Sequence, residues 1–447
     1  MKTIRIGTGA GYAGDRIEPA IELIEKGNID YIIFECLAER TIAIAQEQKL
    51  KNPNKGYNDL LEYRMEKILS SCQKNNVKII TNMGAANPIA AAKITKKIAE
   101  EKGLRDLKIA SVLGDDVLEK IDKYMGYKVL ETGEELEKLK GQIVSANAYL
   151  GIDGILEALE NGADIIITGR VADPALFLAP LVYEFNWGLE DYEIIGKGII
   201  IGHLLECGGQ VTGGYYADPD YKDVERLWEL GFPIAEVKDN GDAIITKVEG
   251  SGGKVSLDTC KEQLLYEIHD PSQYLTPDGI ADFTNLHLKE VEKDKVSIKG
   301  GKGAKRPDKL KVSIGYKDCF IGVGEISYGG SGAVKRAKLA AKIVQERLEM
   351  QEISVDEIRY DLIGINSLYG NVINIYDKEL NEVRLRISAR TNDKDIANKV
   401  VNEVEALYTN GPAGGGGAEK SIKEIVSVAS IFIPRNDVDI KVMYEEV

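Results

Sequence analysis

The stretch TIRIGTGAGYAGDR, residues 3–16, decides the fold of this chain. Residues 3–6 form a short apolar strand, and glycines at positions 9, 11 and 14 follow with the spacing G-x-G-x-x-G. A second apolar strand, residues 30–34, ends in Glu35, 21 residues after the third glycine. A strand, a glycine turn, a helix and a second strand ending in an acid are the fingerprint of a dinucleotide-binding βαβ unit. The stretch predicts a parallel α/β sheet and makes nucleotide binding the first hypothesis to weigh.

The alternation of strands and helices continues to about residue 170. Further strands are expected at 77–81, 107–113, 142–146 and 164–168, with helices at 57–75, 90–102 and 154–160 between them. Nearly unbroken apolar strands of this kind form a parallel sheet that helices cover on both faces. After about residue 200 the apolar segments become shorter, β-branched and hairpin-like. We expect an α/β fold with a parallel sheet in residues 1–205, followed by a mixed α/β domain in residues 206–447.

Composition limits the classes of partner. The chain has 447 residues, 44% hydrophobic and 29% charged, with a formal charge of −15. Such a charge argues against nucleic acid and anionic membranes as partners. No apolar run is long enough to span a bilayer, and no signal peptide precedes the first strand. The five cysteines form no C-x-x-C pair and are expected to be free thiols. We expect a cytoplasmic homo-oligomer.

Polar side chains follow the predicted strands repeatedly. Ligands of open parallel sheets bind where the carboxyl ends of the strands meet, so these side chains predict one shared cleft. A carboxylate there can act as a general acid or base, and arginine can clamp a substrate carboxylate with two hydrogen bonds. The catalytic candidates are Asp15, Glu35 and Glu39, and the substrate-binding candidates are Arg16, Arg40, Asn82, Asn87, Asn147, Arg170 and Asp173.

The charged pair after the glycines weakens the nucleotide hypothesis. Asp15 would repel a pyrophosphate at the helix N-terminus, and Tyr12 would crowd its approach. Glycines after a first strand also serve simply to let the chain turn tightly. Binding of NAD or a flavin is therefore the less favoured interpretation.

His203 and Glu206 are further catalytic candidates and also the metal-ligand candidates. On a helix, positions three residues apart share a face, so the imidazole and the carboxylate could grip one divalent ion. The spacing provides no third ligand. A hydrogen-bonded histidine in a glycine-rich loop is the alternative, and there His203 could act as an acid or base without a metal.

Two glycine-rich segments form a further group of candidates. Gly330 and Ser331 precede a predicted helix over residues 331–350, whose free backbone N–H groups could bind an anion. The run at 414–417 could act as a lid or contact a partner chain. An ordinary turn is the alternative for both segments.

Several motifs resemble those of the acyclic terpene utilisation (AtuA-like) family. They are GAGYAGDR at 9–16, DYIIFECLAERT at 30–41, TNMGAANP at 81–88, TGRVAD at 168–173 and GPAGGGG at 411–417. The resemblance implies a role in the catabolism of branched acyl or polycarboxylate intermediates, at a hydratase or carbon–carbon lyase step. Longer members carry a small C-terminal domain, so the resemblance implies the split form and a small second subunit as partner.

Three functional hypotheses follow. The first is a lyase, a hydratase/dehydratase or carbon–carbon lyase, that acts on a branched hydroxy- or polycarboxylic acid or its CoA thioester by acid/base proton abstraction with arginine clamps. The second is an NAD(P)- or flavin-dependent oxidoreductase that uses the glycine motif. The third is a non-catalytic subunit of a two-chain complex.

Overall fold

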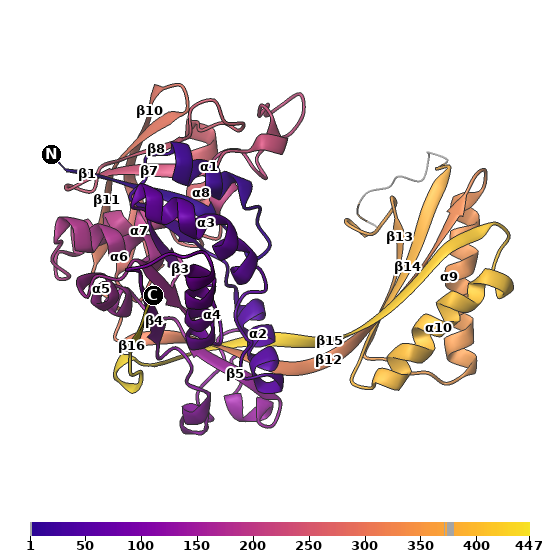
Figure 1. The fold of residues 1–447 in the computed structure, drawn as a ribbon. Coiled ribbons are helices and arrows are strands. Elements are labelled where there is room, and N and C mark those ends of the chain that lie inside the picture. The colour runs from indigo at the N-terminus through magenta and orange to yellow at the C-terminus, as the bar shows by residue number, and fades with distance from the viewer. Residues whose placement is uncertain (1, 371, 373–379) are drawn as a thin grey trace. The chain divides into compact units, whose positions relative to one another are not determined.

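The computed structural model describes residues 2–370, 372 and 380–447, which form two compact units (Figure 1). The main unit comprises residues 1–315 and 428–447, and the inserted unit comprises residues 316–427. None of the helices in the described part of the chain is long and apolar enough to span a membrane. All five cysteines are free.

The main unit is built on an 11-stranded mixed sheet in the order β16-β4-β6-β3-β2-β1-β7-β8-β11-β10-β9. Five neighbouring strands run parallel: β4 (Lys108–Leu113), β6 (Ile165–Thr168), β3 (Lys78–Thr81), β2 (Tyr31–Phe34) and β1 (Thr3–Ala10). The antiparallel strands are β7 (Pro233–Lys238), β8 (Ala243–Lys247), β9 (Tyr274–Leu275), β10 (Ile280–Glu292), β11 (Lys295–Ala304) and β16 (Lys441–Glu446).

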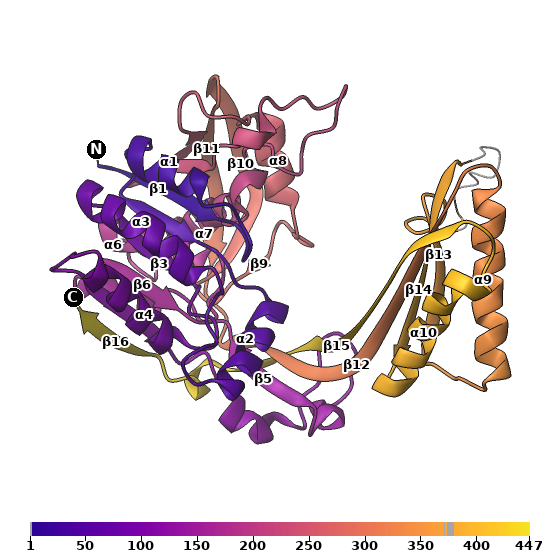
Figure 2. The ribbon, with the colours of Figure 1, turned by 45° about the vertical axis from the view of Figure 1, so that its right-hand side comes forward.

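Helices cover both faces of the parallel strands, as the sequence predicts (Figures 1 and 2). One face carries α1 (Glu18–Lys26), α3 (Leu61–Asn75) and α4 (Pro88–Glu101), and the other carries α5 (Asp153–Glu160), α6 (Ala175–Phe185) and α7 (Tyr192–Glu206). The chain moves outward along the sheet through β1, β2, β3 and β4 and then steps back to β6. Because crossovers are right-handed, this reversal puts α5 on the opposite face. Two further α-helices of the main unit are α2 (Glu39–Lys51) and α8 (Leu257–Leu265).

Sequence features explain the parallel strands. Isoleucines fill β2, β3 and β6, and Ile32, Ile80 and Ile167 are completely buried because both faces of the sheet are covered. Helix α4 begins where Pro88 predicts, and the Asn87 side chain accepts a hydrogen bond from the backbone N–H of Ala90 at 3.3 Å.

The strand expected at 142–146 exists but lies elsewhere. β5 (Ile143–Ala148) pairs with β12 (Lys309–Gly329) and not with the parallel sheet. A parallel neighbour needs a crossover connection, usually a helix. Between β4 and β5 the chain forms two short 3-10 helices, η1 (Leu118–Tyr124) and η2 (Leu136–Leu139), and no α-helix that would carry β5 back to the edge of the parallel sheet.

The apolar glycine-rich segment near residue 200 is helix α7, not a loop. A Cβ on Gly196 would lie 2.3 Å from the carbonyl oxygen of Lys302, and one on Gly202 would lie 2.7 Å from that of Pro174. These glycines therefore allow the helix to pack closely against its neighbours. The boundary expected between residues 205 and 206 falls inside the main unit, because the strands that follow α7 extend the same sheet as β1.

The inserted unit has its own βαββαβ order and core. Its strands follow the order β13-β14-β12-β15, and helices α9 and α10 pack against the sheet. Along β14, Leu385 and Ile387 are buried toward the helices, while the alternating Arg384 and Arg386 pair with acids of neighbouring strands. The elements not yet given are α9 (Ala333–Met350), β13 (Glu357–Ile363), β14 (Glu382–Thr391), α10 (Lys394–Asn410) and β15 (Gly415–Pro434).

Candidate functional site

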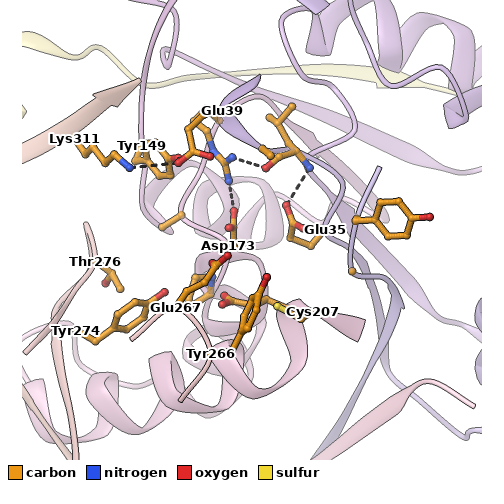
Figure 3. A pocket seen from close by; sticks show the side chains of 18 of the residues that line it. Glu35, Glu39, Tyr149, Asp173, Cys207, Tyr266, Glu267, Tyr274, Thr276 and Lys311 are labelled. Atoms are coloured by element: carbon orange, nitrogen blue, oxygen red, sulfur yellow. Dashed lines mark hydrogen bonds and ion pairs between the residues drawn. The ribbon is translucent and has the colours of Figure 1, made fainter. Parts of the chain in front are cut away.

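A cavity of about 1060 Å³ lies in the main unit (Figure 3). The residues after β1, β2 and β6, the C-terminus of α7, residues 266–277 and the start of β12 form its wall. Open α/β sheets bind their ligands at this carboxyl edge. The cavity brings together six of the sequence-predicted residues: Asp15, Glu35, Glu39, Arg170, Asp173 and Glu206.

Glu35 directly follows β2 and has a buried side chain. Its Oε1 accepts hydrogen bonds from the backbone N–H of Leu37 at 3.0 Å and from Nδ2 of Asn82 at 2.9 Å. Burial, followed by the nearby Asp173 carboxylate, raises the pKa of Glu35 well above its ordinary value. Asn82 is buried, and its Oδ1 accepts the N–H of Cys36 at 2.7 Å, so Asn82 orients Glu35 and does not line the cavity.

The pKa of Glu39 is shifted in the opposite direction to that of Glu35. The Tyr149 hydroxyl donates to its Oε1 at 2.5 Å, and Lys311 Nζ lies 3.3 Å from the same oxygen (Figure 3). Burial raises the pKa of Glu39, but the Tyr149 hydrogen bond, the helix backbone and Lys311 outweigh it and lower the pKa to about 2. Glu39 is therefore ionised at neutral pH.

The Arg170 guanidinium group forms its hydrogen bonds within the protein. Its guanidinium group donates to the carbonyl oxygens of Leu37 and Val171 and to Oδ1 of Asp173, and it stacks 4.5 Å from the ring centroid of Tyr149. The side chain is only 1% exposed. Arg170 therefore fixes the loop after β2 to the loop after β6, and these groups already occupy donors that the predicted clamp on a substrate carboxylate would use. Burial raises the pKa of Asp173, although Arg170 opposes this shift.

His203 and Glu206 form a buried pair at the end of α7. His203 Nδ1 lies 2.7 Å from Glu206 Oε1, and among the described residues neither His203 Nε2 nor Glu206 Oε2 has a hydrogen-bond partner. Burial raises the pKa of Glu206 to about 7, while His203 opposes the shift. Burial lowers the pKa of His203, but the Glu206 carboxylate has the larger combined effect, so the pKa of His203 lies above its ordinary value. Because Glu206 reaches the cavity wall, the pair can hold and release a proton there.

The glycine turn after β1 is closed by Asp15. Its Oδ2 accepts the N–H of Gly11 at 2.9 Å, and its Oδ1 accepts the N–H of Arg16 at 3.0 Å. These are backbone donors that a bound phosphate would require. A Cβ on Gly11 would lie 2.3 Å from the backbone carbonyl carbon of Cys207, so this glycine serves the close approach of α7. The geometry of the turn favours a packing role over dinucleotide binding.

The other predicted residues lie away from the cavity wall. Arg16 and Arg40 have exposed side chains, Asn87 caps α4, and Asn147 Nδ2 donates to Asp115 Oδ2 at 2.9 Å. Gly330 and Ser331 belong to the inserted unit.

Several wall residues were absent from the sequence-based candidates. Tyr149 and Lys311 hold Glu39, and Tyr274 packs 5.3 Å from His203, measured between ring centroids. Tyr149 follows a strand end, which was a usable signal. Lys311 comes from β12 of the second sheet and Tyr274 from β9 at the end of the first, and the alternation of strands and helices does not predict that either reaches the cavity.

The described residues contain no group of three or more His, Cys, Asp and Glu side chains arranged to hold a metal ion. His203 and Glu206 contact each other, and within the part of the chain that the structure describes no third side chain of these types joins them in a ligand set.

The fold and site define an α/β protein with a carboxylate-lined cavity at the carboxyl edge of its parallel strands. The family described as "Acyclic terpene utilisation family protein AtuA" matches residues 4–444, and the chain belongs to this family. No curated protein matches the chain. Among solved structures, "De novo designed protein Foldit4" is 15% identical, with a TM-score of 0.18, and the match covers 24% of this chain and 99% of that one.

Proposed function

We propose that the protein is a lyase of catabolism that acts on a branched hydroxy- or polycarboxylic acid or its thioester. It would add or remove water, or cleave a carbon–carbon bond, by acid/base catalysis in the cavity. The observation that carries the proposal is that Glu35, Glu39 and Glu206 line one cavity in contrasting surroundings. Glu35 and Glu206 are buried, whereas Glu39 is paired with Tyr149 and Lys311, and these surroundings shift the pKa values in opposite directions. Environments that push such pKa values apart are typical of sites with an acid and a base at neutral pH.

Glu206 and Glu35 fit the two roles. A base works best when its pKa lies near the working pH, and the pKa of Glu206 is about 7. Glu35, whose burial raises its pKa well above the usual range, is the carboxyl group suited to hold a proton and act as the acid. Glu39 stays ionised and holds Tyr149 and Lys311 in place.

In the dehydration direction, Glu206 takes the proton on the carbon next to the substrate carbonyl. Glu35 gives its proton to the hydroxyl group on the following carbon. The C–O bond breaks, water leaves and a carbon–carbon double bond forms, so one carboxyl gains the proton that the other loses. For cleavage of a carbon–carbon bond, the base takes the hydroxyl proton and the acid protonates the carbanion released.

The test is a panel of branched 3-hydroxy acids and their thioesters, with formation of the conjugated double bond followed by ultraviolet absorbance. Glu206→Gln and Glu35→Gln should each lower kcat about 10²–10⁴-fold, the usual contribution of a general acid or base. Activity of the wild type should rise with pH as Glu206 loses its proton near pH 7.

Glu262→Gln is the control, because the Glu262 side chain is exposed, pairs with Lys222 and does not line the cavity. It should keep kcat within a few-fold of the wild type. Thermal unfolding establishes that each variant is folded. Equal activity of all three variants would then contradict the proposal and favour a non-catalytic subunit.

A further inference from the structure

The cavity wall carries many more acids than bases. Of the residues that line it, seven are carboxyl-bearing and three are cationic. The carboxyl-bearing residues are Asp15, Glu35, Glu39, Asp173, Glu206, Glu267 and Asp308, and the cationic ones are Arg170, Lys309 and Lys311. Even where Glu35 and Glu206 hold a proton, a free carboxylate on the substrate would meet repulsion from the remaining acids, ionised Glu39 among them, unless one of these cations could receive it.

Two of the three cations are already occupied. Arg170 is buried, and its donors reach two backbone carbonyl oxygens and Asp173. Lys311 pairs with Glu39 at 3.3 Å and lies 5.0 Å from the ring centroid of Tyr149. Removing either cation from its acid would leave a charge unpaired on a partly buried wall, which is unfavourable. Lys309 remains, with an exposed side chain at the start of β12.

The rest of the wall is largely apolar and includes exposed rings. Tyr215 is 93% exposed and adopts a φ of +64°, a region that aromatic residues rarely occupy. Tyr12 and Leu275 are more than half exposed on the same wall. Buried apolar contributors include Leu37 and Phe232. Exposed apolar groups gathered around a cavity are typical of a ligand site.

We propose that the cavity takes a hydroxyacyl compound whose carboxyl group is masked as a thioester or ester, with an apolar hydrocarbon part that Tyr215 covers. This inference rests on the proposed lyase function and narrows its substrate class to exclude free polycarboxylic acids. The masked carbonyl faces the acidic wall without charge repulsion. The hydrocarbon part removes Tyr215 and its apolar neighbours from water.

Binding of unreactive probes to the full-length protein tests the inference without any turnover. The probes are octanoate, suberate, the N-acetylcysteamine thioester of octanoate and octanoyl-CoA. Their acyl chains carry no hydroxyl group to eliminate, and calorimetry at pH 7.5 gives their Kd values. We expect both thioesters to bind at least ten-fold more tightly than octanoate and suberate. If octanoyl-CoA binds more tightly than the N-acetylcysteamine thioester, and Lys309→Ala removes this difference, CoA is the carrier. If the two thioesters have equal Kd values, the substrate is a simple thioester or ester.

Tyr215→Ala should weaken thioester binding about 5- to 20-fold. Tyr221→Ala is the matched control, because Tyr221 is 85% exposed and does not line the cavity. It should leave the Kd unchanged. Thermal unfolding of both variants establishes that they are folded.

Three results would overturn the inference: octanoate or suberate binding as tightly as the thioesters, no binding of any probe at millimolar concentration, or an unchanged Kd in Tyr215→Ala. If the free acids bind more tightly, the lyase proposal remains, with free acids as its substrates. Tight thioester binding with no lyase activity on any hydroxyacyl thioester would instead overturn the proposed function.

Discussion

At the scale of single residues, the main unit buries acids that lie behind the cavity wall as well as acids that form it. Asp115 accepts hydrogen bonds from Asn147 and from the backbone N–H of Arg170, which fixes the loop that carries Arg170. Asp278 accepts the N–H of Ile152 at 2.9 Å. Burial raises the pKa of Asp115 to about 6 and that of Asp278 to about 7. These acids make folding stability depend on pH.

Asp278→Asn should remove part of that dependence. Because the folded state holds the Asp278 proton more tightly than the unfolded state, its contribution to stability is complete below about pH 4 and disappears as pH rises through about 7. Relative to the variant, the wild type should lose up to about 1.4 kcal/mol of unfolding free energy per pH unit over this range. Urea unfolding of both proteins at pH 4 to 8 measures the difference.

Asp308→Asn provides the control, since the Asp308 side chain is 92% exposed. Its unfolding curves should follow those of the wild type at every pH. Parallel curves for Asp278→Asn and the wild type would contradict the prediction.

At the scale of elements, the site depends on how the end of α7 meets the end of β1. The Thr8 hydroxyl donates to the carbonyl oxygen of Leu205 at 3.0 Å, and Gly11 lies against the backbone of Cys207 and Gly208. This contact places Glu206 on the same wall as Asp15. The two acids come from elements about 190 residues apart, and a small residue at position 11 makes their approach possible.

Gly11→Ala should therefore disrupt the site. The new Cβ would lie 2.3 Å from backbone atoms that cannot rotate away, so the turn after β1 must move off α7. We expect a loss of roughly 1–3 kcal/mol in unfolding free energy, the range of an overpacked core, together with weaker probe binding.

Gly14→Ala is the matched variant in the same turn. Its Cβ would meet only the exposed Tyr12 side chain, at 3.0 Å, and that side chain can rotate. It should remain within about 0.5 kcal/mol of the wild type in urea unfolding. Equal losses in the two variants would show that the contact with α7 is not the cause.

The sequence predicted elements well where one local rule decides them. Pro88 marked the start of α4, and isoleucine runs marked β2, β3 and β6. The strand-end rule also brought Glu35 and Asp173 to one cavity. The placement of β5 was wrong because strand pairing depends on the crossover, which local pattern does not encode.

Predictions for individual site residues were limited by long-range contacts. Arg170 has the strand-end position expected of a ligand-binding residue, but carbonyl oxygens of Leu37 and Val171 take its donors. Lys311 reaches Glu39 from a strand 272 residues away. Such partners follow from the whole sheet, so no local pattern identifies them.

At the scale of the whole molecule, the inserted unit has its own core. Val344, Leu385 and Val404 pack in one buried cluster formed entirely within residues 316–427. We expect this segment to fold when it is expressed alone, with a single cooperative thermal transition and an unfolding free energy of about 5–10 kcal/mol. Circular dichroism and urea unfolding provide the measurements.

A matched variant, Leu385→Asp, places a charge in that cluster and should abolish the transition. A segment that shows no cooperative unfolding, even before this substitution, would contradict the prediction.

The pairing of β16 with β4 sets an order of events during synthesis. β4 lies at residues 108–113, and its outer edge is completed only by residues 441–446. At about 5–20 residues per second, roughly 330 further residues keep that edge unpaired for about 15 seconds to one minute. An unpaired strand edge attracts other chains. The outer edge of β4 is therefore closed only after residues 441–446 have been synthesised, and until then it is open to pairing with a neighbouring chain.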